Sequence, residues 1–147
     1  MRFMALDIGE KTVGVAISDE LGIAASPRET LRRDGSEFDR LTNWIEREQV
    51  GEVVAGLPVS LDGSQGPSAV RVLEFVATLR ARLTIPVVTW DERLTTTEAE
   101  KFLIATGASR AKRRKVVDQI AATLLLQNYL RAREYAADGS NDSGGFA

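Results

Sequence analysis

The chain contains no cysteine and no histidine in its 147 residues. Without thiolates or imidazoles it cannot build a Cys/His zinc site, and it cannot transfer acyl groups with a Ser-His pair. Carboxylates, lysines and hydroxyls activated by another group are the catalytic side chains that remain at neutral pH. Because carboxylate oxygens bind hard divalent cations, the two absences favour carboxylate chemistry assisted by a metal ion.

Long apolar segments are missing as well. The longest mostly apolar run covers residues 120–126, whereas a membrane-spanning helix needs about 18 apolar residues. No apolar signal core precedes Asp7. We therefore expect a cytoplasmic protein that does not bind membranes.

The length of the chain allows one domain with a hydrophobic core, since 44% of the residues are hydrophobic. We expect this domain to cover residues 1–136. Residues 137–147 are rich in Gly, Ser, Asn and Asp and have little apolar surface to bury, so we expect a disordered tail there. The sequence is compatible with a monomer and with a homodimer.

Charge is unevenly distributed along the chain. The net charge is -2 and the pI is about 5.3, which argues against a uniformly basic nucleic-acid-binding protein. Residues 101–135, however, contain eight basic and two acidic side chains, so this segment carries +6 and the remainder carries -8. We therefore expect a polyanion such as nucleic acid to bind one face only.

A basic cluster lies in this segment, ahead of the last expected helix. Its members are Arg110, Lys112, Arg113, Arg114 and Lys115. Cations at the N-terminus of a helix are unfavourable for stability because they oppose the helix dipole. Binding to nucleic-acid backbone phosphates therefore explains the cluster better than its alternative, a solvated charge run.

The hydrophobic pattern predicts alternating strands and helices. Strands are expected at residues 2–7, 13–18, 24–31, 53–57 and 86–90, and Pro27 makes the third an edge strand or a bulge. Helices are expected at residues 36–48, 68–82, 97–106 and 115–133, with Ser36 as an N-cap and Pro67 in a first turn. This order predicts an α/β three-layer fold whose five-stranded mixed sheet has an antiparallel hairpin edge and parallel strands, flanked by helices.

Three carboxylates are candidates for catalysis. Asp7 closes the first strand, and the pair Asp91-Glu92 follows the last strand, at the end where such sheets place their ligand sites. Because side chains alternate along a strand, only one of the pair is expected to share the pocket of Asp7, and we choose Glu92. Asp118 lies in the last expected helix beside small residues that let the helix approach the sheet closely.

Each acid also has an ordinary structural interpretation. Asp7 suits a turn, Glu92 suits a solvated loop in which it pairs with Arg93, and Asp118 suits a helix boundary at the surface. If the three converge, they would hold one or two Mg²⁺ or Mn²⁺ ions that activate water against a scissile phosphate. This chemistry hydrolyses phosphodiesters without histidine, so it fits the composition.

A turn-rich loop over residues 58–67 leads into the second expected helix. It offers a phosphate seat at the helix N-terminus, and a plain structural turn is the alternative. The loop lacks the Gly-Lys-Ser/Thr sequence of a Walker loop.

Several motifs stand in order along the chain. They are Leu6-Asp7-Ile8-Gly9, the run from Val13 to Asp19, Gly56-Leu57-Pro58 with Asp62-Gly63 and Gly66-Pro67, the run from Asp91 to Thr96, and Lys115 with Asp118 and Ala121-Ala122. Together they resemble the YqgF family, also called RuvX. The resemblance covers nearly the whole chain except the tail.

This resemblance implies an RNase H-like fold related to the RuvC resolvases. It also implies an endonuclease that matures the 5′ end of precursor 16S ribosomal RNA. On the family's acidic positions stand Asp7, Glu92 and Asp118, as catalytic metal ligands, while Lys11, Arg93 and the cluster from Lys112 to Lys115 stand in or beside its motifs. The sequence departs from the family pattern at Thr12-Val13, where Arg-Ile is expected.

Three other functions remain open on the sequence. A Holliday junction resolvase would use the same acids on four-way DNA. An actin-like ATPase also begins with an Asp-x-Gly hairpin, although such proteins close two domains of this kind over a nucleotide. A non-catalytic RNA-binding module would use the acids only structurally.

Overall fold

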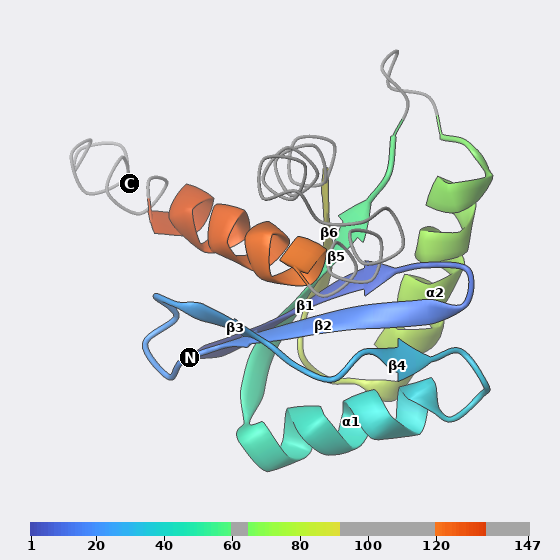
Figure 1. Cartoon of the computed structure of the whole chain (residues 1–147). Helices are drawn as coiled ribbons and strands as arrows, with labels where there is room; N and C mark the ends of the chain where they lie inside the picture. The colour runs from blue at the N-terminus through green and yellow to red at the C-terminus, as the bar shows by residue number, and fades with distance from the viewer. Residues whose placement is uncertain (60–64, 92–119, 135–147) are drawn as a thin grey trace, which may run out of the picture.

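The computed structural model describes residues 1–59, 65–91 and 120–134. The elements named below are those of Figure 1. They are β1 (Arg2–Ile8), β2 (Thr12–Ser18), β3 (Ala25–Pro27), β4 (Leu31–Arg32), α1 (Glu37–Glu48), β5 (Val50–Leu57), α2 (Pro67–Arg82) and β6 (Val87–Asp91), followed by a helix over residues 120–134.

The strands form one mixed sheet with the order β3-β2-β1-β5-β6, and β4 pairs separately with β2. β1 and β2 form the expected antiparallel hairpin, with Asp7 opposite Gly14. β5 and β6 join β1 in parallel, so the carboxyl ends of these strands lie at the same edge of the sheet. The predicted sheet, a hairpin edge followed by parallel strands, is confirmed.

The predicted third strand is divided by its proline. β3 ends at Pro27, which pairs with Ala16, and the chain returns to the same neighbour at β4, where Leu31 pairs with Val13. Proline has no N–H to donate to a ladder, so it is tolerated on such an edge. The edge position is confirmed, but the strand is two short pieces rather than one.

Helices cover both faces of the sheet (Figure 1). α1 and α2 pack on one face, against Met4, Leu6 and other buried side chains of the strands. The helix over residues 120–134 packs on the opposite face, against Phe3 and Ala5. The three layers predicted from the sequence are therefore present.

Helix boundaries follow the sequence signals closely. Ser36 is the N-cap residue of α1, but its side chain does not cap the helix. Instead, Asp34 accepts hydrogen bonds from the Ser36 amide at 2.9 Å and from its hydroxyl at 2.6 Å. Pro67 is the first residue of α2, where its fixed φ is suited to a helix start.

Other predicted elements lie outside the described residues. These are the helix at residues 97–106, the first residues of the helix at 115–133, and the tail at 137–147. Residues 120–134 confirm the part of the last helix that is described. Within the described ranges, none of the helices has the length and hydropathy needed to cross a membrane.

Candidate active site at the carboxyl ends of the parallel strands

Asp7 lies one residue before the end of β1 and is partly buried. Side chains alternate along a strand, so Asp7 shares a face with Phe3 and Ala5, which contact the helix over residues 120–134. The face of α1 and α2 receives Leu6 and Ile8 instead. The β1 strand therefore presents its terminal carboxylate on the side of the C-terminal helix.

The neighbouring strands end beside Asp7. Leu6 pairs with Ala55 of β5, so Gly56 follows at the level of Asp7. Gly56 in turn pairs with Trp90 of β6. Gly56 is buried and contributes no side chain, so no β5 side chain stands between Asp7 and Trp90 at this level.

Small side chains bring the helix over residues 120–134 close to this part of the sheet. Ala5 and Ala16 are register partners in the hairpin, and both are fully buried. Ala122 of the helix is also fully buried and belongs to the same apolar cluster. Because these three side chains are methyl groups, they allow the helix to approach the sheet closely at Ala5, two residues before Asp7.

Further along the helix, large side chains make the contact. Leu125 and Leu126 are fully buried on the sheet, and Tyr129 follows at helical spacing. The Tyr129 ring meets the Trp90 ring edge-on at a centroid distance of 5.3 Å and the Phe3 ring at 6.2 Å. This helix face is thus defined by contacts to β1 and β6.

A polar cluster, Glu52, Tyr129 and Arg133, lies within this apolar interface. The Tyr129 hydroxyl donates a hydrogen bond to Glu52 Oε2, and Arg133 Nη1 lies 3.4 Å from the same oxygen. The carboxylate of Glu52 is buried on β5, with the whole residue 8% exposed. Burial, reinforced by the hydrogen bond to Glu52, raises the pKa of Tyr129 above its usual value.

The turn between β1 and β2 carries Lys11 at the same edge of the sheet as Asp7. The turn is closed by the Gly9 amide, which donates to the Thr12 carbonyl at 2.8 Å. A Cβ on residue 9 would lie only 3.1 Å from that carbonyl oxygen. Lys11 itself is exposed.

Arg33 holds this turn through two hydrogen bonds. Its guanidinium donates to the Gly9 carbonyl at 3.1 Å, and its backbone amide donates to the Lys11 carbonyl at 2.9 Å. The guanidinium also lies 3.5 Å from the carboxylate of Glu37, which is buried, and stacks over the Phe75 ring. The backbone around Lys11 is therefore tied to α1 and α2.

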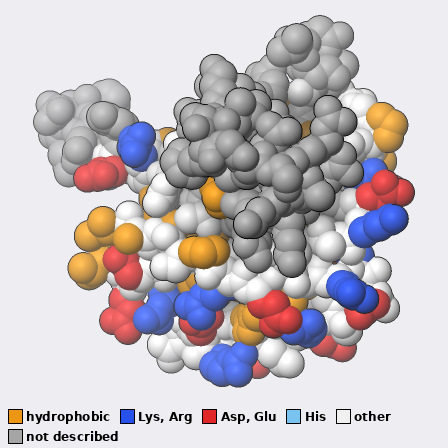
Figure 2. Space-filling model, in the orientation of Figure 1, with side chains coloured by type: hydrophobic (Ala, Val, Ile, Leu, Met, Phe, Trp, Pro, Cys, Tyr) orange, Lys and Arg blue, Asp and Glu red, His pale blue; other side chains and the backbone are white. Residues whose placement is uncertain are grey.

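Two of the predicted site residues, Asp7 and Lys11, belong to the part of the chain that the structure describes. The remaining ones lie outside it: Glu92, Asp118, Arg93, Arg110, Lys112, Arg113, Arg114 and Lys115. Among residues 1–59, 65–91 and 120–134, no three acidic side chains gather closely enough to hold a metal ion. On the face seen in Figure 2, the described acidic and basic side chains are interspersed.

Sequence reasoning missed three residues that join distant elements: Arg33 at the turn after β1, and Glu52 with Tyr129 between β5 and the last helix. The predicted strand began at residue 53, which left Glu52 outside the sheet. An acid two residues before Val54 is in phase with the face that β5 turns to the last helix, and Tyr129 follows Leu125 and Leu126 on the helix stripe. The alternation along the strand and the helical spacing of Leu125, Leu126 and Tyr129 were therefore the sequence signals that could have paired Glu52 with Tyr129.

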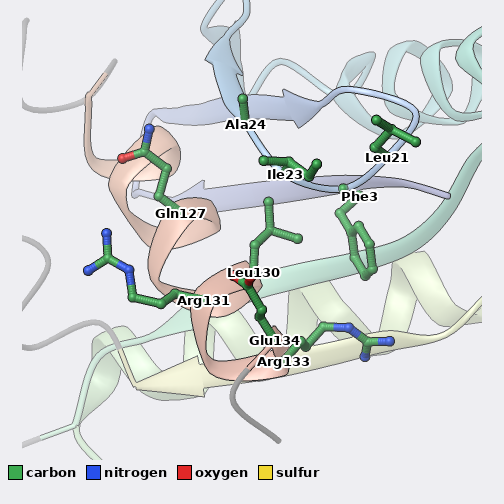
Figure 3. Close-up of a pocket in the computed structure, with 10 residues that line it drawn as sticks. Phe3, Leu21, Ile23, Ala24, Gln127, Leu130, Arg131, Arg133 and Glu134 are labelled. Atoms are coloured by element: carbon green, nitrogen blue, oxygen red, sulfur yellow. The ribbon is translucent and has the colours of Figure 1, made fainter. Parts of the chain in front are cut away.

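A cavity of about 670 Å³ lies elsewhere, between the turn after β2 and the C-terminal half of the last helix. Figure 3 shows Ile23, Leu130 and Phe3 gathered around it, with the Arg131 side chain directed away from Phe3. Phe3 stands near the start of β1 and Asp7 near its end. The cavity is therefore separate from the candidate active site.

Solved structures share this architecture. Thermus thermophilus RuvC, in complex with a Holliday junction substrate, matches with a TM-score of 0.55 and 17% identity, covering 91% of this chain and 96% of RuvC. The fowlpox virus Holliday junction resolvase matches with a TM-score of 0.52 and 15% identity, covering 90% of this chain and 99% of the resolvase. The fold is therefore RNase H-like, as in RuvC.

Sequence relatives are much closer. The model of the RuvX family, described as Holliday junction resolvase, matches residues 1–132. A protein of Desulforudis audaxviator is 52% identical over 136 residues, covering 91% of this chain and 96% of the relative. A protein of Thermoanaerobacter pseudethanolicus is 44% identical over 137 residues, covering 91% and 99%. Both are named "Putative pre-16S rRNA nuclease".

The chain belongs to the RuvX family. This confirms the resemblance seen in its motifs, and it confirms the prediction of a nuclease, whose substrate is a nucleic acid.

Proposed function

We propose that this protein is a divalent-metal-dependent endonuclease that matures the 5′ end of precursor 16S ribosomal RNA. Its catalytic metal ligands are Asp7, Glu92 and Asp118. The observation that carries the proposal is the position of Asp7, a partly buried carboxylate at the carboxyl end of the central strand, on the face covered by the last helix. Ligand sites of open α/β sheets form at that edge.

The phase of β6 supports Glu92 as the second acid. Val88 and Trp90 pack with the cluster under the last helix, whereas Val87 belongs to the opposite core. In this alternation Asp91 is in phase with Val87, and the proposal assigns the next residue in the sequence, Glu92, to the same face as Asp7. The choice of Glu92 over Asp91 rests on this phase.

The phase of the last helix supports Asp118 as the third. Its sheet-facing stripe runs through Ala122, Leu125, Leu126 and Tyr129. Residue 118 precedes Ala122 by four positions, which is the spacing of neighbours on one helix face. On this spacing we propose that Asp118 belongs to the same stripe as Ala122.

The donor set suits Mg²⁺ or Mn²⁺. All three side chains offer hard carboxylate oxygens, and no histidine or cysteine competes for softer metals. A bound divalent ion supplies Lewis acidity toward the phosphate and lowers the pKa of a bound water. In the proposal the contribution of the chain is to hold the three carboxylates at fixed positions around the ion.

Cationic residues around the site hold the nucleic-acid backbone in the proposal. Lys11 lies four positions after Asp7 on the turn that Arg33 braces. The others are Arg93, Arg110, Lys112, Arg113, Arg114 and Lys115. Phosphate contacts of this kind orient the strand without reading its bases.

Ribosomal RNA is preferred over branched DNA as the substrate because of the relatives. Those named for pre-16S rRNA are 41% to 52% identical to this chain. The Thermus thermophilus RuvC and fowlpox virus resolvase structures are only 17% and 15% identical, and the family description is the observation that favours a Holliday junction substrate. Precursor ribosomal RNA implies residence in the cytoplasm, with residues 1–136 as the catalytic domain.

The test is a cleavage assay on labelled precursor 16S RNA and on a mobile four-way DNA junction. Each substrate is incubated with Mg²⁺, with Mn²⁺ and with a chelator, using the wild type, Asp7→Asn and the control Asp39→Asn. Asp39 lies on α1, where it pairs with Arg82 at 2.7 Å, so its variant makes the same chemical change away from the site.

We expect metal-dependent cleavage of the RNA that Asp7→Asn reduces by at least about 100-fold, because losing a metal ligand costs more than losing its outer-shell support. Asp39→Asn should retain wild-type activity. Cleavage of the junction alone would replace ribosomal RNA by the resolvase function. Cleavage that persists in the chelator or in Asp7→Asn would refute the metal site, and absence of all cleavage would favour a binding module.

A further inference from the structure

The contact between the last helix and the sheet is mostly non-directional. Ala122, Leu125, Leu126 and Leu130 bury apolar surface against the strands. Apolar packing specifies volume but discriminates weakly between neighbouring registers of a helix on a sheet. A slip of one helical turn would move every residue on the helix by about 5.4 Å.

Two polar side chains in the described part of this helix reach the same buried carboxylate on β5. Glu52 accepts the hydroxyl proton of Tyr129 in a hydrogen bond and lies 3.4 Å from Arg133 Nη1. Residues 129 and 133 are one helical turn apart and therefore share a face. Arg133 also lies over the Phe3 ring at 4.9 Å, which fixes the guanidinium from the β1 side.

Stability alone does not account for this cluster. Burying a carboxylate costs free energy, and apolar side chains of similar volume often stabilise a protein as well or better. Polar groups buried in apolar interfaces are known to select one register among several that packing tolerates. At its position on β5, Glu52 is reached by both Tyr129 and Arg133.

We infer that Glu52 and Tyr129 are positioning residues that set the register of the last helix on the sheet, and thereby the distance of Asp118 from Asp7. This inference rests on the proposed function, because it concerns the placement of the proposed metal ligand. Glu52 is the register partner of Phe3, four positions before Asp7 on β1, so its contact with Tyr129, the register lock, lies away from the strand end where the reaction is proposed. The two residues act through the helix and not on the substrate.

The active site requires a fixed register of the last helix on the sheet, because its proposed ligands come from separate elements. Asp7 belongs to β1, whereas Asp118 belongs to the segment that leads into the helix over residues 120–134. Metal–oxygen distances tolerate deviations of only about 0.2 Å. A helix free to shift along the sheet by a fraction of a turn would therefore lose the metal ion before the fold is lost.

The test compares Tyr129→Phe, Glu52→Gln and the control Val72→Ala, with Asp7→Asn as the reference for a lost metal ligand. Tyr129→Phe removes only the donor hydroxyl. Glu52→Gln keeps an oxygen that accepts the Tyr129 hydrogen bond, so it is the conservative rescue. Val72 is buried on the opposite face of the sheet, and its variant lowers stability without touching the cluster.

For each variant we measure Mn²⁺ affinity by calorimetry, kcat and KM for cleavage, and the free energy of unfolding in urea. Tyr129→Phe should weaken Mn²⁺ binding and lower kcat by about 10-fold to 100-fold, the usual effect of outer-shell support, while KM stays within about twofold. Glu52→Gln should lose less than about threefold in both quantities. Val72→Ala should lose stability but keep its Mn²⁺ affinity.

The two hypotheses fail in different ways. If Asp7→Asn abolishes Mn²⁺ binding but Tyr129→Phe behaves like Val72→Ala, with lower stability and unchanged affinity and kcat, the register lock is wrong and the metal site stands. The lock is also wrong if Glu52→Gln loses as much affinity as Tyr129→Phe. If Asp7→Asn binds Mn²⁺ and cleaves like the wild type, the proposed function fails and the lock fails with it.

Discussion

At the scale of single residues, polar contacts between distant residues hold in place the elements that carry and cover Asp7. Arg33 ties the turn after β1 to the helix layer, and Glu52 and Tyr129 tie the last helix to the sheet. Each of these contacts joins residues far apart in the sequence. A motif identifies the acid, but only the folded chain shows what holds it in place.

Arg33→Met should destabilise the protein by about 2 kcal/mol, because it leaves the buried carboxylate of Glu37 without its cation. The measurement is urea unfolding of the variant and of Arg40→Met. Arg40 pairs with Glu29 in an exposed bridge, which contributes little. Equal losses for both variants would show that the Arg33 contacts do not stabilise the turn.

Tyr129 should make the protein sensitive to alkali. Burial and the bond to Glu52 raise its pKa in the folded state, so the folded state holds the phenolic proton more tightly than the unfolded chain. The resulting stability is fully present below the unfolded pKa of about 10 and is lost as pH rises through the folded pKa. The measurement is urea unfolding between about pH 8 and pH 11, a range that brackets the unfolded pKa. The free energy of unfolding should fall more steeply with pH in the wild type than in Tyr129→Phe. Parallel curves would contradict this assignment.

At the scale of elements, the sequence predicted those that have a clear period or a terminal signal. The hairpin, α1 after Ser36 and α2 from Pro67 all agree with it. β5 begins earlier than predicted. The prediction excluded Glu52 because a polar residue inside a buried strand resembles a loop residue until its partner is known. Pro27 was recognised as an edge residue, but the division into β3 and β4 depends on where β2 offers hydrogen bonds.

Ala122→Leu should separate the last helix from the sheet, because the added side chain meets the buried Ala5 and Ala16. Overpacking of this kind costs about 1–3 kcal/mol. The matched control is Ala69→Leu in α2, another fully buried alanine on the opposite side. We expect similar losses of stability in urea, but a loss of cleavage only in Ala122→Leu. Equal cleavage by both variants would show that the close approach of this helix is unimportant for activity.

At the scale of the whole molecule, the sheet brings together what the sequence separates. β1, β5 and β6 run in parallel although long segments intervene between them, so the end of the first strand lies level with the end of the last. Topological rules predicted this edge as the site from strand order alone. They could not predict the buried polar cluster, since hydrogen bonds between Glu52 and the last helix depend on the register of two distant elements.

The account as a whole depends on one divalent ion shared by three carboxylates. Anomalous diffraction from crystals of the wild type grown with Mn²⁺ tests it most directly, because the manganese signal locates the ion independently of the protein. We predict manganese within about 2.0–2.6 Å of carboxylate oxygens of Asp7, Glu92 and Asp118. Manganese bound elsewhere, or a site at the end of β1 that Glu92 and Asp118 do not reach, would contradict the account.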